Sequence, residues 1–320
     1  MTDSVKQFAR AFAPASIGNL AAGFDQLGLA IEGPGDHVNA HRSEKLGVRI
    51  RSITGSDLAH GAERLPLDAA LNTASIAVAE LLHDLEPGFG IELEIEKDTP
   101  LGSGMGGSAA SAVAAVVAAN ALMPEPLAHA QLLPYALEGE AAASKAIHAD
   151  NVAPSLFGGL VWCPGNRLPE VLELRMPDGL SSILVHPELV VATAESRQGL
   201  AAQVSLQLSV LQQSYLAGVI AACYRNDSAL LAQCLRDEII EPQRSAAITG
   251  FDHVQKSALE AGALACSISG SGPSVFAISE AQNAEKVRDV MIEAFAAHQL
   301  HSVAYISATQ APGARVLEAV

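Results

Sequence analysis

The stretch PLGSGMGGSAASAVAAVVAAN, residues 100 to 120, places four glycines in a short loop directly before a run of small apolar residues. Such a loop lets the backbone approach a phosphate group closely, and the helix after it presents free N–H groups and its positive dipole end. The stretch therefore predicts a phosphate site. Ser108 stands where it could cap the expected helix or bind a metal ion, and a plain serine cap on a buried helix is the simpler alternative.

Two common glycine loops fit this stretch poorly. Gly102, Gly104 and Gly107 satisfy the pattern G-x-G-x-x-G, but a dinucleotide-binding loop needs a strand after its helix, and here a second helix is expected. A P-loop needs a lysine after its last glycine, and Gly107 is followed directly by Ser108. A different phosphate-binding loop is therefore indicated.

Composition narrows the class of protein. The chain has 320 residues, 49% of them hydrophobic, which is enough for two domains. Its 19 Lys and Arg stand against 35 Asp and Glu, a net charge of −16 with no basic cluster, so we expect no nucleic-acid partner. The N-terminus lacks the apolar core of a secretory signal, and the run AASAVAAVVAANALM is too short to span a bilayer. We therefore expect no membrane partner and a cytoplasmic location, with the four scattered cysteines reduced rather than in disulfides or a zinc site.

Local patterns predict an α+β fold with antiparallel sheet rather than a doubly wound parallel sheet. In the first half, GVRIRSI and GIELEIEKD alternate as strands do, and NTASIAVAELLHDL has helical spacing with Asn72 or Thr73 available as its N-cap. We place a domain boundary near Gly165, which gives domains at 1–165 and 166–320. Further helices are expected at roughly 126–145, 203–224, 227–240, 252–261 and 283–298, and further strands at SSILVHP, LVVAT, ACSIS, SVFAIS and SVAYIS.

Two more stretches accompany the glycine loop. They are APASIGNLAAGFDQLGLAI (13–31) near the N-terminus and SISGSGPSVFAI (267–278) near the C-terminus. With the loop between them, they resemble in order and spacing the three motifs of the GHMP kinases, a superfamily that includes galactokinases, homoserine kinases and mevalonate kinases. Within it, PASIGNLAAGFDQLGLA, IHADNVAPSLFGGL (147–160), TAESR (193–197) and EPQR (241–244) resemble the homoserine kinase family. The resemblance runs from about residue 10 to the C-terminus.

The resemblance implies both fold and activity. The fold would be the two-domain GHMP kinase fold, with an N-terminal α/β domain like the second domain of ribosomal protein S5, a ferredoxin-like C-terminal domain, and the active site between them. The activity would be ATP-dependent phosphorylation of the side-chain hydroxyl of L-homoserine, a step of threonine biosynthesis. Members of the family often form homodimers.

The same resemblance implies an ATP and magnesium site. Magnesium would be held by Ser108 and Glu140, since Mg²⁺ needs few protein oxygens beside the phosphates; taken alone, Glu140 would be a solvated helix residue. Asn72 would meet the adenine, which does not conflict with a capping role. The family loop usually reads G-L-G-S-S-A, so Met105 keeps an apolar anchor while Gly107 lacks a hydroxyl. The residues expected around the ATP phosphates are Pro100, Leu101, Gly102, Ser103, Gly104, Met105, Gly106, Gly107, Ser108, Ala109 and Ala110.

For the amino-acid substrate, Asp25 is suited to the ammonium, and Arg197 and Arg244 are suited to the carboxylate, which a guanidinium grips with two parallel hydrogen bonds. The resemblance adds Asn19, Thr193 and His148 around the substrate. Taken alone, Asn19 and Asp25 would be turn residues, the arginines surface ion-pair partners and His148 a structural histidine.

The catalytic expectation concerns His148, Asp150 and Asn151. Other GHMP kinases use an aspartate near this point, and a gapless match places Asn151 there with Asp150 one residue away. An amide cannot accept a proton, so we hypothesise that Asp150 is no strong base and that the hydroxyl proton leaves late. Two alternatives remain: a GHMP kinase for a sugar or isoprenoid alcohol, and a catalytically inactive nucleotide-binding member whose support is Gly107.

Overall fold

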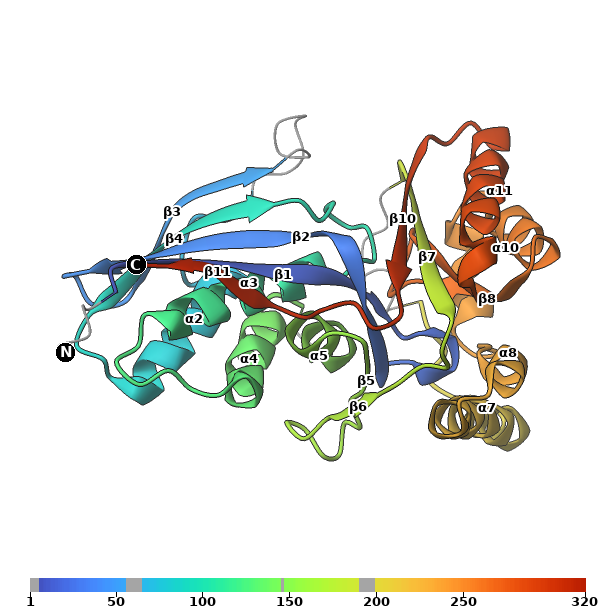
Figure 1. Cartoon of the computed structure of the whole chain (residues 1–320), viewed down its shortest axis with the longest axis horizontal. Helices are drawn as coiled ribbons and strands as arrows, with labels where there is room; N and C mark the ends of the chain where they lie inside the picture. Colours follow the sequence, from blue (N-terminus) through green and yellow to red (C-terminus); the bar gives the residue numbers. More distant parts are fainter. Residues whose placement is uncertain (1–5, 56–64, 145–146, 190–198) are drawn as a thin grey trace.

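The computed structural model describes residues 6–55, 65–144, 147–189 and 199–320, which form two sheets with helices around them (Figure 1). The first sheet runs in the order β11-β1-β2-β4-β3, with β5 paired to β2 and β6 paired to β5. The second runs β10-β7-β9-β8. Every pair is antiparallel except β3 with β4, which confirms the prediction of an α+β fold with antiparallel sheet.

The first sheet is made from the N-terminal half and the last strand of the chain. On β4 the sequence GIELEIEK sends its aliphatic residues inward and its glutamates outward, as alternation requires. The strands are β1 (Phe8–Gly18), β2 (Leu27–Ser43), β3 (Val48–Gly55), β4 (Gly90–Lys97), β5 (Leu160–Trp162), β6 (Leu172–Leu174) and β11 (Arg315–Ala319).

Four helices cover one face of this sheet (Figure 1). They are α2 (Thr73–Leu85), α3 (Gly107–Ala121), α4 (Leu133–Ser144) and α5 (Ala149–Phe157). All of α3 from Ala109 onward is buried, and its alanines let the sheet and three helices approach it closely. The glycine loop before α3 is thereby attached to the centre of the core.

The second sheet has helices on both sides. It consists of β7 (Leu180–Pro187), β8 (Ala263–Ile268), β9 (Val275–Glu280) and β10 (Ser302–Ala308). One face packs on α10 (Phe251–Glu260) and α11 (Ala284–Ala297). The other shares a core with β2, β6, α7 (Leu206–Arg225) and α8 (Ser228–Cys234), and the short α9 (Glu241–Arg244) follows α8.

Most predicted elements exist, with three corrections to their limits. The N-cap of α3 is Gly106, so the prediction that Ser108 caps this helix is wrong. The helix expected from 126 begins only at Leu133, because residues 129–132 form a tighter 3₁₀ turn. The helix expected to reach 240 ends at Cys234, because the Asp237 carboxylate accepts the N–H groups of the next residues and starts a new turn. Most of the strand predicted at LVVAT lies outside the described residues.

Sequence patterns missed the two longest strands. The stretch 13–31 was expected to be only turn-rich, yet β1 and β2 occupy most of it, because tertiary pairing overrides the poor strand propensity of proline and glycine. The domain boundary near Gly165 stays a prediction. The structure adds that the chain changes sheet between β6 and β7, and that β11 returns to the first sheet.

Helix α7 differs from every other described helix. By length and composition alone it could cross a membrane, and it is the single described helix for which this is so. Only 11% of the apolar 18-residue stretch in this helix is buried. Its inner side packs on α8 and on the turn that follows β1.

Candidate active site

One cavity of about 320 Å³ lies where the two sheets meet, and nearly all described residues expected in the site line it. Ala109 and Ala110 do not; both are fully buried in α3. Thr193 and Arg197 lie outside the described residues. The expected residues that do line the cavity are Asn19, Asp25, Asn72, Pro100, Leu101, Gly102, Ser103, Gly104, Met105, Gly106, Gly107, Ser108, Glu140, His148, Asp150, Asn151 and Arg244.

The glycine loop is held by backbone contacts from both other motifs. The Ser16 N–H donates to the Met105 carbonyl (3.0 Å), and the Ser274 N–H donates to the Ser103 carbonyl (3.1 Å). Gly104 has φ +75°, and a Cβ there would lie 2.4 Å from the Ser269 carbonyl oxygen. Only glycine fits at this position, so the loop conformation is determined before any ligand arrives.

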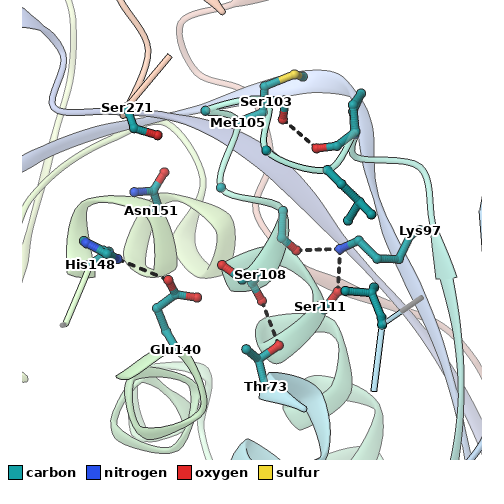
Figure 2. A pocket seen from close by; sticks show the side chains of 18 of the residues that line it. Thr73, Lys97, Ser103, Met105, Ser108, Ser111, Glu140, His148, Asn151 and Ser271 are labelled. Atoms are coloured by element: carbon teal, nitrogen blue, oxygen red, sulfur yellow. Dashed lines mark hydrogen bonds and ion pairs between the residues drawn. The ribbon is translucent and has the colours of Figure 1, made fainter. Parts of the chain in front are cut away.

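The loop ends at the N-terminus of α3, which borders the cavity. No acidic residue stands in the first turn of this helix, so no side chain within the helix offsets its positive dipole end. Ser108 is exposed there, and Figure 2 shows its side chain and that of Glu140 approaching the same space from α3 and α4. This arrangement suits an anion beside a small cation.

Lys97 is a site residue that sequence reasoning missed. Its Nζ donates to the Asp36 carboxylate (2.5 Å), the Ser111 hydroxyl (2.8 Å) and the Gly107 carbonyl (2.8 Å), and it lines the cavity (Figure 2). Asp36 also accepts from the Thr99 N–H (3.2 Å) and is fully buried. The available signal was a charged residue at an inward position of the otherwise alternating strand β4. A P-loop has its lysine after the last glycine, whereas here Lys97 stands before the loop, at the end of β4.

Asn72 caps α2, as one of the two predicted alternatives had it. Its Oδ1 accepts the Ala74 N–H (3.0 Å), and its Nδ2 donates to the Pro66 carbonyl (3.2 Å). The residue is 7% exposed and lines the cavity. The contact with adenine stays a prediction.

At the other end of the cavity, the turn after β1 has a strained backbone. φ is +69° at Asn19, +38° at Leu20, +55° at Ala21 and +57° at Asp25. Each such residue costs roughly 1–2 kcal/mol, although Asn and Asp tolerate this region better. Asn19 holds the turn: its Oδ1 accepts the Asp25 N–H (3.0 Å) and its Nδ2 donates to the Gly270 carbonyl (2.8 Å). Such strain is often found at ligand-binding sites.

Asp150 lies buried beside this turn. Its Oδ2 accepts the Asn19 N–H (2.8 Å), while its Oδ1 accepts no hydrogen bond from the described residues. Burial, and then the charge of Asp25, raise the pKa of Asp150 to about 6. The two carboxylates therefore make a site that a cation would stabilise.

Arg244 faces the same end from α9. It is 6% exposed, and its Nη1 donates to the Gly270 carbonyl (2.9 Å), which also accepts from Asn19. The guanidinium carbon lies 5.4 Å from the centre of the Phe24 ring. Arg244 is therefore buried in the site rather than placed on the surface.

Glu140, His148 and Asn151 also line the cavity, and Figure 2 shows their side chains near one another. Glu140 is 3% exposed and its Oε1 is 3.2 Å from His148 Nδ1, so the reading of Glu140 as a solvated residue is wrong. Asn151 Oδ1 accepts from the Ser16 hydroxyl (3.1 Å). An amide held in this way can orient a substrate oxygen but cannot take its proton.

The donor set at the loop fits magnesium. Among the described residues no cluster of three or more His, Cys, Asp or Glu could hold a metal ion. Ser108 and Glu140 offer two oxygens beside the helix N-terminus, and Mg²⁺ commonly takes one or two protein oxygens together with phosphates and water. These two residues therefore suit Mg²⁺ bound with a nucleotide better than a metal held by protein alone.

Comparison with known proteins agrees with this geometry. The family model for the GHMP kinases N terminal domain matches residues 72–159, and the model for the GHMP kinases C terminal region matches residues 219–297. Together the matches include the glycine loop, strands β8 and β9 of the second sheet, and helices α10 and α11.

Individual relatives match nearly the whole chain. A homoserine kinase of Xylella fastidiosa is 46% identical over 310 residues, covering 97% of this chain and 94% of that protein. The crystal structure of a homoserine kinase from Cytophaga hutchinsonii has a TM-score of 0.94 at 43% identity, with 99% of each chain covered. A mevalonate kinase of L. major shares the fold at a TM-score of 0.66 and 15% identity, covering 97% of this chain and 98% of that one.

Proposed function

The chain belongs to the GHMP kinase family, with the two-domain fold that its motifs predicted, and we propose that it transfers the γ-phosphoryl group of ATP to the side-chain hydroxyl of L-homoserine. The product is O-phospho-L-homoserine. One observation carries the proposal: a single cavity joins a preformed phosphate loop to an end that is lined by two carboxylates and a buried arginine.

ATP lies with its phosphates along Pro100 to Ser108 and at the N-terminus of α3, where backbone N–H groups and the helix dipole favour negative charge. Lys97 holds the end of the loop in place through its hydrogen bond to the Gly107 carbonyl. The adenine lies toward Asn72, beside the apolar residues Ile53, Leu65, Pro66, Leu71 and Ile95 that line this part of the cavity.

The amino acid occupies the other end. Its ammonium lies near Asp25 and Asp150, whose mutual repulsion and burial a positive charge relieves. Its carboxylate meets Arg244, and we propose that Arg197 and Thr193 complete this end. A sugar has neither an ammonium nor a carboxylate group, and mevalonate has a carboxylate but no ammonium group for Asp25 and Asp150, so these charges disfavour the alternative acceptors.

The reaction is an in-line attack of the substrate hydroxyl oxygen on the γ-phosphorus, with ADP as leaving group. Its transition state is loose, so positioning and charge neutralisation supply most of the rate. Asn151 and His148 orient the hydroxyl. Asp150, held by the Asn19 N–H, serves the ammonium rather than acting as a strong base, and the hydroxyl proton passes late to the phosphate.

Magnesium belongs to the same proposal. Ser108 and Glu140 would hold it, and His148 keeps the Glu140 carboxylate in place through the 3.2 Å contact. A bound Mg²⁺ would offset the charge of the phosphates. Retention of both oxygens disfavours the inactive-kinase alternative, because a protein that only binds nucleotide has no need of a metal site built in this way.

We further propose a cytoplasmic enzyme of threonine biosynthesis that works as a homodimer and has neither nucleic acid nor membrane as partner. The net charge of −16 supports the absence of a nucleic-acid partner.

The first test is ADP release from ATP and Mg²⁺ in a coupled assay. L-homoserine is compared with L-serine, L-threonine, galactose and mevalonate. Release that depends on homoserine is the expected result. Release only with a non-amino-acid alcohol would refute the substrate assignment, and ATP binding without turnover on any acceptor would favour the inactive member of the family.

A further inference from the structure

Helix α7 leaves an unusual face uncovered. Of its twenty residues only Val219 and Ala222 are buried. Leu206 is 80% exposed, Val210 54% and Tyr224 77%. Surface helices of this length normally carry charged residues on the outer side. Here no charged residue stands between Arg197 and Arg225, in a chain with 17% charged residues.

From this face we infer that α7 is where a second copy of the chain docks. The outer face of α7 is the line formed by Leu206, Val210, Gln213, Ala217 and Tyr224, which recur at helical spacing and are all exposed. The inference gives a location to the homodimer part of the proposed function and does not depend on the reaction.

Charge favours a second copy as the occupant. Each copy carries a net charge of −16, so two copies repel one another unless they meet where charges are absent. Other parts of the surface carry charges; the outer side of the first sheet, for example, carries Arg10, Arg51, Glu92, Glu94 and Glu96 in ion pairs. The outer face of α7 lets two acidic molecules approach without burying like charges.

The order of side chains along α7 suits self-pairing. Large apolar residues stand at both ends, Leu206 and Val210 at one and Tyr224 at the other, with Ala217 between them. In an antiparallel pair related by a twofold axis near Ala217, the large end of one helix meets the large end of the other. The small residue at the crossing point lets the two helices approach closely.

A bilayer fits this helix less well. The inner side of α7 packs against α8, so closely that a Cβ on Gly218 would lie 2.2 Å from Cys234 Sγ, and Val219 belongs to the shared core. Spanning a membrane would expose that core. Lying on a membrane surface usually requires basic residues around the apolar face, and between Arg197 and Arg225 the chain has none.

A second copy bound to α7 would also support the turn at the amino-acid end of the cavity. The inner side of α7 packs on the turn Ala21–Gly23, which lies between Asn19 and Asp25. This turn has a strained backbone, so support from behind by a paired α7 would help to keep it in place.

The test is the oligomeric state of the full chain, measured by sedimentation velocity over a range of concentrations. We expect a dimer whose association strengthens as salt is raised from low to moderate concentration, because salt screens the repulsion between acidic copies. The double variant Leu206→Glu/Val210→Glu should weaken association by about 100-fold or more while far-UV circular dichroism is unchanged. Leu46→Glu, at a residue that is 72% exposed in another loop, is the matched control and should leave the dimer intact.

A second measurement tests whether the two copies of α7 cross near Ala217. Ala217→Cys should form a disulfide-linked dimer under mild oxidation, whereas Leu46→Cys and the wild type with its native cysteines should not. A monomeric wild type, a dimer that survives the double glutamate variant, or co-flotation of the wild type with vesicles of zwitterionic and anionic lipid would each overturn the inference. The kinase assay is scored separately, so an inactive protein that still dimerises through α7 would refute only the proposed activity.

Discussion

The two ends of the cavity are built on different principles. At the phosphate end, polar groups are already paired: loop carbonyls accept backbone hydrogen bonds from both other motifs, and Lys97 is held by Asp36, Ser111 and Gly107. At the amino-acid end, like charges are left together, with Asp25 beside a buried Asp150 whose pKa is raised to about 6. A ligand at the first end meets a loop that is already held in place, whereas an ammonium group at the second end would add a positive charge beside two carboxylates. The difference teaches that binding of nucleotide and of amino acid should respond differently to mutation and pH.

The largest effect is expected from breaking the Lys97–Asp36 ion pair at the phosphate end. Lys97→Met leaves the Asp36 carboxylate buried without its cation, which should cost about 3–5 kcal/mol of unfolding free energy. Urea denaturation measures this, and the exposed Lys45→Met is the control. Loss of less than about 1 kcal/mol would show that the ion pair does not hold the loop.

At the amino-acid end, Arg244→Lys keeps the charge but loses the guanidinium fork. We expect kcat/KM for homoserine to fall about 100-fold while the KM for ATP changes little. Steady-state kinetics with each substrate varied in turn provides the measurement, and Arg236→Lys on the exposed loop after α8 is the control. Equal losses for both substrates would place Arg244 outside the amino-acid end.

Asp150→Asn should stabilise the free protein. The pKa of Asp150 is raised from 3.8 to about 6, so its contribution to stability is fully present below pH 3.8 and is lost as pH rises through 6. An amide keeps the hydrogen bond from Asn19 without the buried charge, and we expect a gain of about 1–3 kcal/mol at pH 8 that disappears near pH 4.

Thermal unfolding at the two pH values measures that gain. The same Asp150→Asn variant should bind homoserine less tightly yet retain turnover at saturation. Turnover abolished with fold and binding intact would contradict the view that Asp150 is no strong base.

The pH dependence of the wild type sharpens the comparison. Protonation of Asp150 removes one charge that the ammonium uses, so kcat/KM for homoserine should fall about tenfold per pH unit below pH 6. The KM for ATP should be nearly constant over the same range. A parallel fall for both substrates would assign the titration to another group.

The smallest effect is expected at Gly107, where the usual family loop has a serine. A Cβ there would lie 3.1 Å from Thr99 Cγ2 and 3.3 Å from Thr99 Cβ, so Thr99 occupies the space that a serine side chain would need. Gly107→Ser should therefore lower activity by less than about tenfold, and adding Thr99→Ala should restore it. Activity that rises in the single variant would mean that the hydroxyl matters more than the space.

The sequence by itself determined the α+β class, the family and most of the residues that meet in the cavity. It could do so because a glycine with positive φ or a helix cap is a local requirement, and because three motifs in order are a specific signal. Gly104 has a positive φ that favours glycine, and of the two caps that the sequence offered for α2, Asn72 and Thr73, the structure shows Asn72.

Only the tertiary structure decided the rest. The pairing of β1 with β2 overrode local propensity, and Lys97 became a site residue because Asp36, 61 residues away, lies beside it. The raised pKa of Asp150 and the burial of Glu140 depend on what surrounds them in space. Helices α3 and α7 are likewise both rich in apolar residues; α3 has no charged residue, and α7 has none before its last residue, Arg225. Which of them is enclosed and which is left uncovered is set by the elements packed around each, since burial is a property of neighbours and not of the residues alone.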